Sequence, residues 1–309
     1  VGLLKHASNV MLSGQNIQRI FEEAGFPEGC FQNLTIGSKA VDAIIRDKRI
    51  KAVTLTGSTA AGSAVAATAG EMIKKTVLEL GGSNALVVFE DADLGAAAEI
   101  CVQARFQNTG QSCIAGKRLL LQESIYDQFL SIFQKQVEGL KCGDPMDPDT
   151  FIGVQAREDL AKELEEQVAR SVEMGAEVVL GGKRNKAFYE PTILTGVTKD
   201  MPVFLEETFG PAIGVSVFKD EAEAVELVNT SPFGLGVSIF TRNAERTRRL
   251  VPQFEDGAVF VNELVKSDPR LPFGGTKGSG YGRELSFHGI REFVNIKTVF
   301  IKGLNDKEH

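Results

Sequence analysis

Short apolar runs alternate with amphipathic segments along most of the chain, and this alternation predicts strands and helices in turn. Up to about residue 80, apolar runs of strand type occupy 1–4, 30–34, 51–56 and 76–80, and segments of helical spacing occupy 17–23, 38–46 and 59–70. Ser38 stands where a helix cap is expected. Strands that alternate with helices favour a parallel sheet covered by helices, so we expect an α/β fold.

The same alternation restarts after Gly81-Gly82, where we expect a domain boundary. Strands are predicted at 85–89, 118–121, 178–180, 192–194, 213–217, 237–240 and 258–261. Helices are predicted at 93–107, 125–140, 156–174, 222–229 and 244–251. The glycine-rich segment 272–282 is predicted to contain no regular element, and 293–301 alternates like an edge strand that pairs with another subunit.

Composition narrows the classes of function. Apolar residues make up 43% of the 309 residues and charged residues 24%, a balance typical of globular proteins. The net charge of −7 comes without a basic block, which argues against nucleic-acid binding. No apolar run approaches the ~20 residues of a membrane span.

The four cysteines are widely spaced and form no CxxC pair, which favours free thiols in a reducing compartment, and we expect a cytoplasmic protein. The three histidines lack metal-ligand spacing, so no metal site is expected.

Cys113 lies in a small, polar, glycine-containing turn between a predicted helix and an apolar run. Lys117 and Arg118 follow it, and a thiol near basic groups at such a turn is a plausible activated nucleophile. A small residue that fills the core is an equally good interpretation of this segment alone.

A nucleophilic cysteine needs a base, and the chain offers few candidates. His6 and His288 are poor candidates because no papain-like signature accompanies Cys113, and no Gly-x-Ser-x-Gly elbow occurs. Glu79 ends an apolar strand directly before Gly81-Gly82, where burial would raise its pKa towards that of a general base. The alternative is a structural glutamate held in a salt bridge.

Gly57-Ser58 connects a predicted strand to a predicted helix, an arrangement in which backbone N–H groups can meet a phosphate. Ser63 stands where a P-loop requires lysine, so this segment is not a nucleoside-triphosphatase signature. Phosphate binding and a structural turn therefore both remain open for this segment.

Five motifs in order resemble the aldehyde dehydrogenase superfamily, and most closely its succinate-semialdehyde dehydrogenase-like branch. The resemblance covers essentially the whole chain. The motifs are Leu-Thr-Gly-Ser (55–58), Leu-Glu-Leu-Gly-Gly (78–82), Gln-Asn-Thr-Gly-Gln-Ser-Cys (107–113), Glu-Glu-Thr-Phe-Gly-Pro (206–211) and Pro-Phe-Gly-Gly-Thr-Lys-Gly-Ser-Gly-Tyr-Gly-Arg-Glu (272–284).

The resemblance implies NAD(P)-dependent oxidation of a small semialdehyde, such as succinate semialdehyde, to its acid. It implies that Cys113 attacks the aldehyde and forms a thioester, and that Glu79 activates the water that hydrolyses it. It also implies two sets of binding residues: Lys5, Ser8, Gly57, Ser58, Glu207 and Phe209 for the cofactor, and Ser267, Arg270 and Phe273 for the substrate.

Ser8 bears on the choice of cofactor, because NAD-preferring members of the family usually carry glutamate there. A serine admits and hydrogen-bonds a 2′-phosphate that a carboxylate would repel, so we expect NADP to be preferred over NAD. Gln107 stands where some succinate-semialdehyde enzymes carry a substrate-binding arginine, which makes Ser267 and Arg270 the candidates for binding a substrate carboxylate.

The resemblance also implies an organisation into domains. We expect a partial dinucleotide-binding domain at 1–81, a catalytic domain at 82–288 and an oligomerisation arm at 289–309, with a homodimer or homotetramer for the full-length protein. The family's amino-terminal third is expected to be missing, and with it an asparagine that completes the oxyanion hole. A CoA-acylating enzyme is disfavoured because such relatives lack the glutamate found at Glu79. An impaired fragment that acts as a binding or oligomerisation module is the alternative.

Overall fold

The computed structural model describes residues 1–303. The chain folds into two compact units. The first unit comprises Val1–Val53 and Ala64–Lys75, and the second comprises Thr54–Ser63 and Thr76–His309. The chain passes between the units within β3 (Ala52–Thr56), within α3 (Thr59–Glu71) and at the start of β4 (Lys75–Glu79). The predicted boundary at residue 81 lies close to the last of these crossings and stays a prediction.

The first unit contains a two-stranded parallel sheet and short helices. Its elements before β3 are β1 (Gly2–Leu4), α1 (Met11–Glu23), β2 (Phe31–Asn33), η1 (Ser38–Ala40) and α2 (Val41–Arg46), and β1 pairs with β2. The expected cap at Ser38 is wrong, because Ser38 is the first residue of η1 and its side chain makes no capping hydrogen bond.

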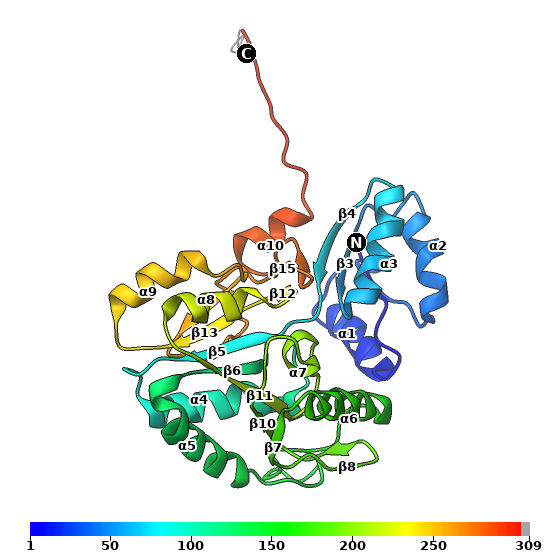
Figure 1. Cartoon of the computed structure of the whole chain (residues 1–309). Helices are drawn as coiled ribbons and strands as arrows, with labels where there is room; N and C mark the ends of the chain where they lie inside the picture. Colours follow the sequence, from blue (N-terminus) through cyan, green and yellow to red (C-terminus); the bar gives the residue numbers. More distant parts are fainter. Residues whose placement is uncertain (304–309) are drawn as a thin grey trace. The chain divides into compact units, whose positions relative to one another are not determined.

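The second unit is built on a seven-stranded sheet, which confirms the predicted α/β fold. In spatial order its strands are β14 (Val259–Val261), β13 (Val237–Phe240), β5 (Asn84–Val88), β6 (Gly116–Gln122), β11 (Ala212–Phe218), β10 (Thr192–Thr195) and β7 (Glu177–Leu180). All neighbouring pairs are parallel except β10 and β7, which are antiparallel. Figure 1 shows β5 and β6 in the middle of this sheet.

Side chains of β5 alternate between two apolar cores, one on each face of the sheet, because successive residues of a strand point to opposite faces. Ala85 and Val87 belong to one core, and Leu86 and Val88 belong to the other. All four are buried, so both faces of the strand are covered. A continuous apolar run is typical of a strand buried in this way.

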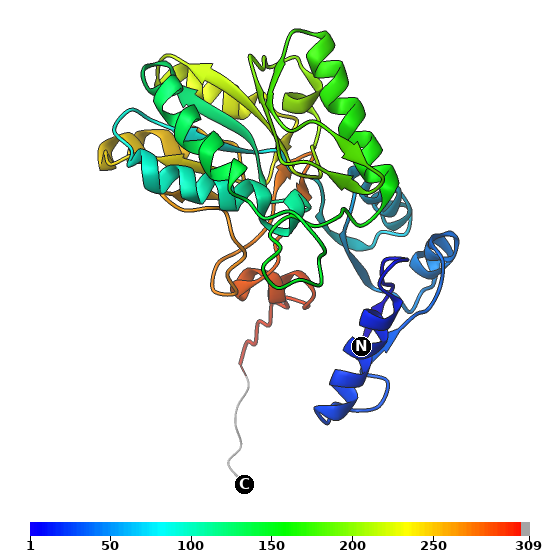
Figure 2. The same ribbon diagram turned by 90° about the horizontal axis from the view of Figure 1, so that it is seen from below.

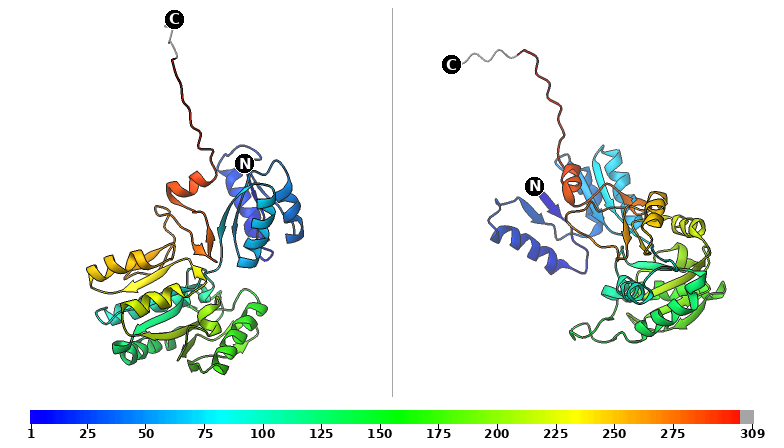
Figure 3. Two further views of the ribbon diagram at one scale, coloured as in Figure 1. Left: turned by 45° about the horizontal axis from the view of Figure 1, so that its top comes forward. Right: turned by 90° about the vertical axis from the view of Figure 1, so that its left-hand side faces the viewer.

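Helices supply the covering layers. α4 (Leu94–Phe106) and α5 (Tyr126–Glu138) pack together and contribute Cys101 and Phe129 to the core that contains Leu86. Figure 2 shows these two helices side by side. α6 (Glu158–Glu173), α7 (Pro202–Leu205), α8 (Glu221–Asn229) and α9 (Ala244–Leu250) contribute to the opposite core. The left view of Figure 3 shows α8 and α9 across the sheet from α4 and α5.

The remaining elements of the second unit are short: η2 (Gln107–Gly110), η3 (Glu123–Ile125), β8 (Arg184–Asn185), β9 (Phe188–Tyr189), β12 (Phe233–Gly234), η4 (Val251–Gln253), β15 (Thr276–Lys277), β16 (Gly280–Tyr281) and α10 (Ser286–Glu292). The glycine-rich segment is therefore more regular than predicted, because β15 pairs with β12 and β16 pairs with β4. The strand expected over 293–301 is absent from the single chain over those residues, and pairing with another subunit stays a prediction. Residues 304–309 of the expected arm lie outside the described residues.

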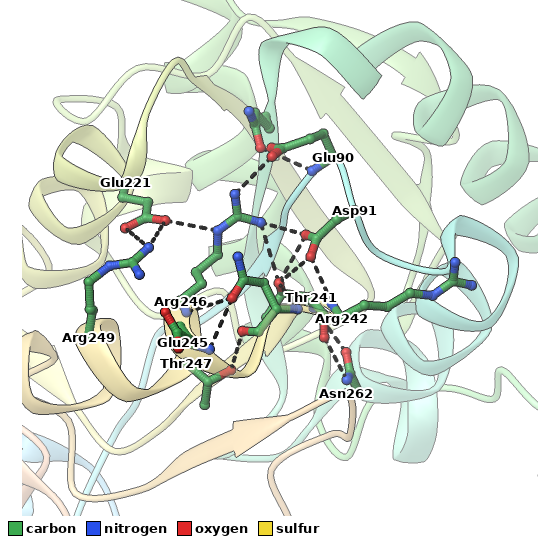
Figure 4. A network of polar contacts seen from close by, with 12 residues as sticks. Glu90, Asp91, Glu221, Thr241, Arg242, Glu245, Arg246, Thr247, Arg249 and Asn262 are labelled. Atoms are coloured by element: carbon green, nitrogen blue, oxygen red, sulfur yellow. Dashed lines mark hydrogen bonds and ion pairs between the residues drawn. The ribbon is translucent and has the colours of Figure 1, made fainter.

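Arg246 lies at the centre of a charged network beside the sheet (Figure 4). Its side chain is only 12% exposed and pairs with Glu90 at 2.8 Å, Asp91 at 2.5 Å and Glu221 at 2.9 Å. Its guanidinium carbon also lies 4.5 Å from the centroid of the Phe89 ring. The network therefore ties α8 and α9 to the end of β5.

Replacing Arg246 with methionine should lower the free energy of unfolding by at least about 2 kcal/mol, because three carboxylates lose a largely buried cation that they share. The matched control is Arg249→Met, which removes a 53% exposed guanidinium that pairs with Glu221 alone. That control should cost less than about 1 kcal/mol. The chain has no tryptophan, so urea unfolding is followed by circular dichroism. Equal losses of unfolding free energy in the two variants would show that Arg246 is no more important to the network than Arg249.

Candidate active site

Glu79 is a buried carboxyl group at the end of β4. It is 2% exposed, and neither of its carboxyl oxygens accepts a hydrogen bond from the described residues. Burial and the neighbouring Glu284 raise the pKa of Glu79 to about 8, and Arg283 opposes that rise. A carboxylate with this pKa is a stronger base than an ordinary carboxylate, so its ionised form can accept a proton from water.

The glycine-rich segment forms part of the wall around Glu79. Gly280 of β16 pairs directly with Glu79. Gly274 has a φ of +157°, and a side chain there would place its Cβ 2.8 Å from Oε1 of Glu79. Glycine at 274 therefore leaves room for the carboxyl group. The glycine-rich segment, which contains most of the last of the five sequence motifs, therefore contacts the candidate base.

Cys113 lies in the loop that joins α4 and η2 to β6. Its thiol is free and half-buried. Asn108 and Thr109 have φ angles of +54° and +56°, a conformation that is costly for the β-branched threonine. Thr109 Oγ1 accepts a hydrogen bond from Gly153 N at 3.1 Å, which helps to hold the loop in this conformation.

Burial raises the pKa of the Cys113 thiol above its usual value, and Lys117 acts against this rise. The carboxylates of Glu207 and Glu79 also raise the pKa. A Cβ at Gly82, three residues after Glu79, would lie 2.5 Å from the carbonyl oxygen of Cys113, and a Cβ at Gly81 would lie 2.5 Å from Oε2 of Glu207. The cysteine loop, the end of β4 and Glu207 therefore lie in one neighbourhood. The structure thus brings together three residues that the sequence proposed as parts of a site.

Lys117 connects these groups. Its side chain is fully buried in β6, and Nζ donates hydrogen bonds to the carbonyl oxygens of Ser112 and Cys113 and to Oε1 of Glu207, each at 2.8 Å. Burial lowers the pKa of Lys117 to about 8, although Glu207 favours the charged form. The sequence pointed to Lys117 only as a basic residue near the thiol.

Glu207 lies just after α7 and against the Gly81-Gly82 pair. Its Oε1 accepts a hydrogen bond from Gly82 N at 3.0 Å as well as from Lys117. A Cβ at Gly81 would lie 2.5 Å from Oε2 of Glu207, and a Cβ at Gly82 would lie 2.5 Å from the carbonyl oxygen of Cys113. Both glycines are therefore required by the close approach of the two site loops.

Arg105 is a second buried cation that sequence reasoning missed. Its Nη2 donates to the carbonyl oxygens of Gly110 at 2.7 Å, Gly210 at 2.6 Å and Thr208 at 3.3 Å. Burial lowers its pKa to about 9. Arg105 thus fastens the loop that carries Cys113 to the loop that carries Glu207. The sequence signal was a single charge in the last turn of α4, next to the apolar residues Ala104 and Phe106.

The Gly57-Ser58 turn precedes the first turn of α3, and Ser58 Oγ accepts a hydrogen bond from Ala61 N at 3.3 Å. The N–H groups of a first helical turn can bind a phosphate. Phe209 is half-buried, with its ring centroid 5.8 Å from Nζ of Lys117. Lys5 and Ser8 belong to the first unit, where Lys5 Nζ donates to the His6 carbonyl and Ser8 is exposed.

The predicted substrate residues lie on one loop. Phe273 lines a depression with Leu271, Lys266 and Asp268. Arg270 is 85% exposed and forms a two-pronged ion pair with Asp268, with contacts of 2.6 and 2.9 Å, and Ser267 is exposed. The guanidinium of Arg270 therefore has a carboxylate partner within the chain. His288 is exposed on α10 with its ring against Phe287.

Within residues 1–303, no helix combines the length and the apolar character needed to cross a membrane. The same stretch contains no group of three His, Cys, Asp or Glu side chains arranged to hold a metal ion.

Comparison with known proteins identifies the family. Residues 1–299 match the model of the aldehyde dehydrogenase family. The succinate-semialdehyde dehydrogenase [NADP(+)] of Mycobacterium leprae is 49% identical over 304 residues, which are 97% of this chain and 66% of that protein. The chain thus spans a little less than two thirds of this relative's length.

Solved structures agree with this match. The succinic semialdehyde dehydrogenase of Streptococcus pyogenes, solved in complex with NADP+, is 38% identical with a TM-score of 0.94, over 97% of this chain and 67% of that one. The salicylaldehyde dehydrogenase of Pseudomonas putida G7 is 34% identical with a TM-score of 0.95, over 99% of this chain and 64% of that one. The chain belongs to the aldehyde dehydrogenase family.

Proposed function

We propose that the protein containing this chain is an NADP-linked dehydrogenase that oxidises a small semialdehyde, with succinate semialdehyde as the first candidate. The observation that carries the proposal is the half-buried Cys113 thiol in the electrostatic neighbourhood of Glu79, a buried carboxyl group with a pKa of about 8. The names of the relatives from Mycobacterium leprae and Streptococcus pyogenes support the choice of substrate and cofactor.

In the proposed reaction, the Cys113 thiolate attacks the aldehyde carbon and forms a thiohemiacetal. A bound nicotinamide would supply the hydride acceptor, and loss of the hydride from the thiohemiacetal would leave a thioester on Cys113. Glu79 then takes a proton from water, and the resulting hydroxide attacks the thioester carbon and releases the acid and the thiolate. The backbone N–H of Cys113 is the proposed donor to the oxyanion.

The residues present fit a dinucleotide. In the second unit, the first turn of α3 after Gly57-Ser58 would hold a phosphate. Oε2 of Glu207 remains available to a ribose hydroxyl, because Gly82 and Lys117 both bond to Oε1. Phe209 is proposed to pack near the nicotinamide. In the first unit, Lys5 and Ser8 are proposed to bind the adenine ribose and its 2′-phosphate.

The proposed substrate residues are Ser267, Arg270 and Phe273. Phe273 would line the pocket for the aliphatic part of the substrate, since it borders a depression. Arg270 would bind the substrate carboxylate in exchange for, or together with, Asp268, its present partner.

NADP should have a lower KM than NAD, and Ser8→Glu should raise the KM for NADP at least about tenfold while changing that for NAD little. The reason is that a carboxylate at position 8 would repel the 2′-phosphate and still accept hydrogen bonds from a ribose diol. The matched control is Asn9→Glu, which adds the same charge to the next exposed residue. A lower KM for NAD in the unaltered enzyme would rule out this assignment.

A thermal-shift titration with NADP distinguishes two hypotheses: that the chain belongs to an active enzyme, or that it acts as a binding or oligomerisation module. A ligand that binds only the folded state raises the melting temperature in proportion to the logarithm of its concentration above Kd. We expect such a rise with NADP, and its absence would favour the module. Coenzyme A-dependent release is disfavoured because Glu79 is available to activate water.

The wider organisation follows the same proposal. We propose a partial dinucleotide-binding domain at 1–81, a catalytic domain at 82–288, an oligomerisation arm from 289 onwards, and a cytoplasmic homodimer or homotetramer. The exposed apolar side chains of Phe293, Ile296 and Phe300 support the proposed arm, because such side chains are commonly covered in an assembly.

A further inference from the structure

The ammonium group of Lys117 contacts both the main chain of Cys113, the proposed nucleophile, and the carboxylate of Glu207, the proposed cofactor-binding residue. Its ammonium has no exposed surface, and the 2.8 Å bonds to Cys113 O and Glu207 Oε1 leave from one nitrogen. Cys113 and Glu207 are far apart in the sequence and lie on separate loops. A shift of either loop would therefore break a hydrogen bond of a buried charge, which is costly.

The charge of Lys117 also acts on the thiol. Burial, Glu207 and Glu79 all disfavour the Cys113 thiolate, whereas Lys117 favours it. A cation acts strongly on its neighbours in a buried site because little water screens it. Among the described residues of this unit, His288 is exposed on α10 with its ring against Phe287. Arg105 bonds to the cysteine loop at Gly110, whereas Lys117 bonds to the carbonyl oxygen of Cys113 itself.

We propose, on the basis of the aldehyde dehydrogenase function above, that Lys117 is a positioning residue with two effects. It holds the Cys113 main chain and the Glu207 carboxylate in one geometry, and its positive charge stabilises the Cys113 thiolate. Cofactor binding through Oε2 of Glu207 and thiolate formation at Cys113 thereby depend on the same side chain.

The positive charge of Lys117 depends on pH, because nearby charged groups and burial act on its pKa. Glu207 and Cys113 favour the protonated ammonium, and burial and Arg105 disfavour it. Burial, the largest influence, lowers the pKa of Lys117 to about 8. The charge is therefore present below about pH 8 and is lost as the pH rises above that value.

Two variants test the proposal: Lys117→Met, which removes the hydrogen bonds and the charge, and Lys117→Gln, which removes the charge but keeps a hydrogen-bond donor. Alkylation of Cys113 by iodoacetamide is measured against pH at the level of the Cys113 peptide, because the chain has four free thiols. Both variants should slow alkylation near pH 7 about tenfold, because the Lys117 charge that favours the thiolate is then missing. The difference from the wild type should shrink as the pH rises above about 8, where the wild-type Lys117 loses its charge. Lys117→Met should also weaken NADP binding in a thermal-shift titration more than Lys117→Gln does.

The matched control is Arg118→Met, which removes the adjacent buried cation. Arg118 donates to the carbonyl oxygens of Ser83 and Val228 and contacts neither Cys113 nor Glu207 through its hydrogen bonds. The control should lose stability and keep the wild-type alkylation profile.

The inference is overturned if the variants at Lys117 alkylate like the wild type, or if the control shifts the profile equally. If Lys117→Met does not fold, the profile of Lys117→Gln decides. Wild-type protein that binds no NADP and oxidises no aldehyde would contradict the proposed function, whereas the alkylation profile decides the role of Lys117 independently.

Discussion

Replacing Cys113 with alanine should abolish aldehyde oxidation, with kcat lowered at least about 10³-fold, because the thiol that would form the thioester is removed. No hydride should reach NADP, since the thiohemiacetal that donates it cannot form. The measurement is NADPH formation in the first turnover, together with mass spectrometry of the peptide that contains Cys113 after denaturation in the presence of substrate. The wild type should carry an acyl group on that peptide.

Cys142→Ala is the matched control, because Cys142 is also a free thiol but is exposed and lies outside the site. This variant should keep wild-type turnover and the acyl group on Cys113. Substantial turnover in Cys113→Ala would remove Cys113 from the mechanism. An acyl group found on Cys142 instead would move the reaction to another part of the chain.

Much of the fold was predictable because each element carries a local signal. The strand 85–89 is an apolar run that the structure buries on both faces, and Asp93 begins the following helix as a cap that accepts a hydrogen bond from Ala96 N. The spatial order of the seven strands was not predictable in the same way, because it depends on contacts between distant segments. The expected cap at Ser38 failed because a 3-10 turn replaced the first turn of the helix there.

The candidate site shows the same division between local and distant signals. A charge at the end of an apolar strand marked Glu79, and the structure buries that charge without a hydrogen-bond partner among the described residues. Lys117 and Arg105 gave no comparable signal, because their partners Glu207 and Gly210 lie roughly a hundred residues away in the chain. Only the folded arrangement of the loops shows that these cations are shared.

Glu79→Gln should separate the two halves of the reaction. The amide keeps the shape of the carboxyl group but cannot accept a proton from water, so thioester hydrolysis should slow about 10²–10⁴-fold. The first hydride transfer depends on Cys113 and should remain, which gives a burst of one NADPH per site followed by a slow steady state. A steady-state rate equal to that of the wild type would show that another group activates the water.

The pKa of Glu79 makes this prediction sharper. Its value of about 8 means that the base is mostly protonated at pH 7, so wild-type hydrolysis should accelerate as the pH rises through about 8, and Glu79→Gln should lose that dependence.

The contribution of Glu79 to folding stability has the opposite dependence on pH. The folded-state pKa lies above the ordinary value of 4.5, so Glu79 favours the folded state below pH 4.5, and this contribution is lost as the pH rises through about 8. The melting temperature of Glu79→Gln, relative to that of the wild type, should therefore rise as the pH increases from 4.5 to about 8. A constant difference in melting temperature across this range would mean that the carboxyl group of Glu79 ionises freely in the folded protein, and its assignment as the general base would lose its physical basis.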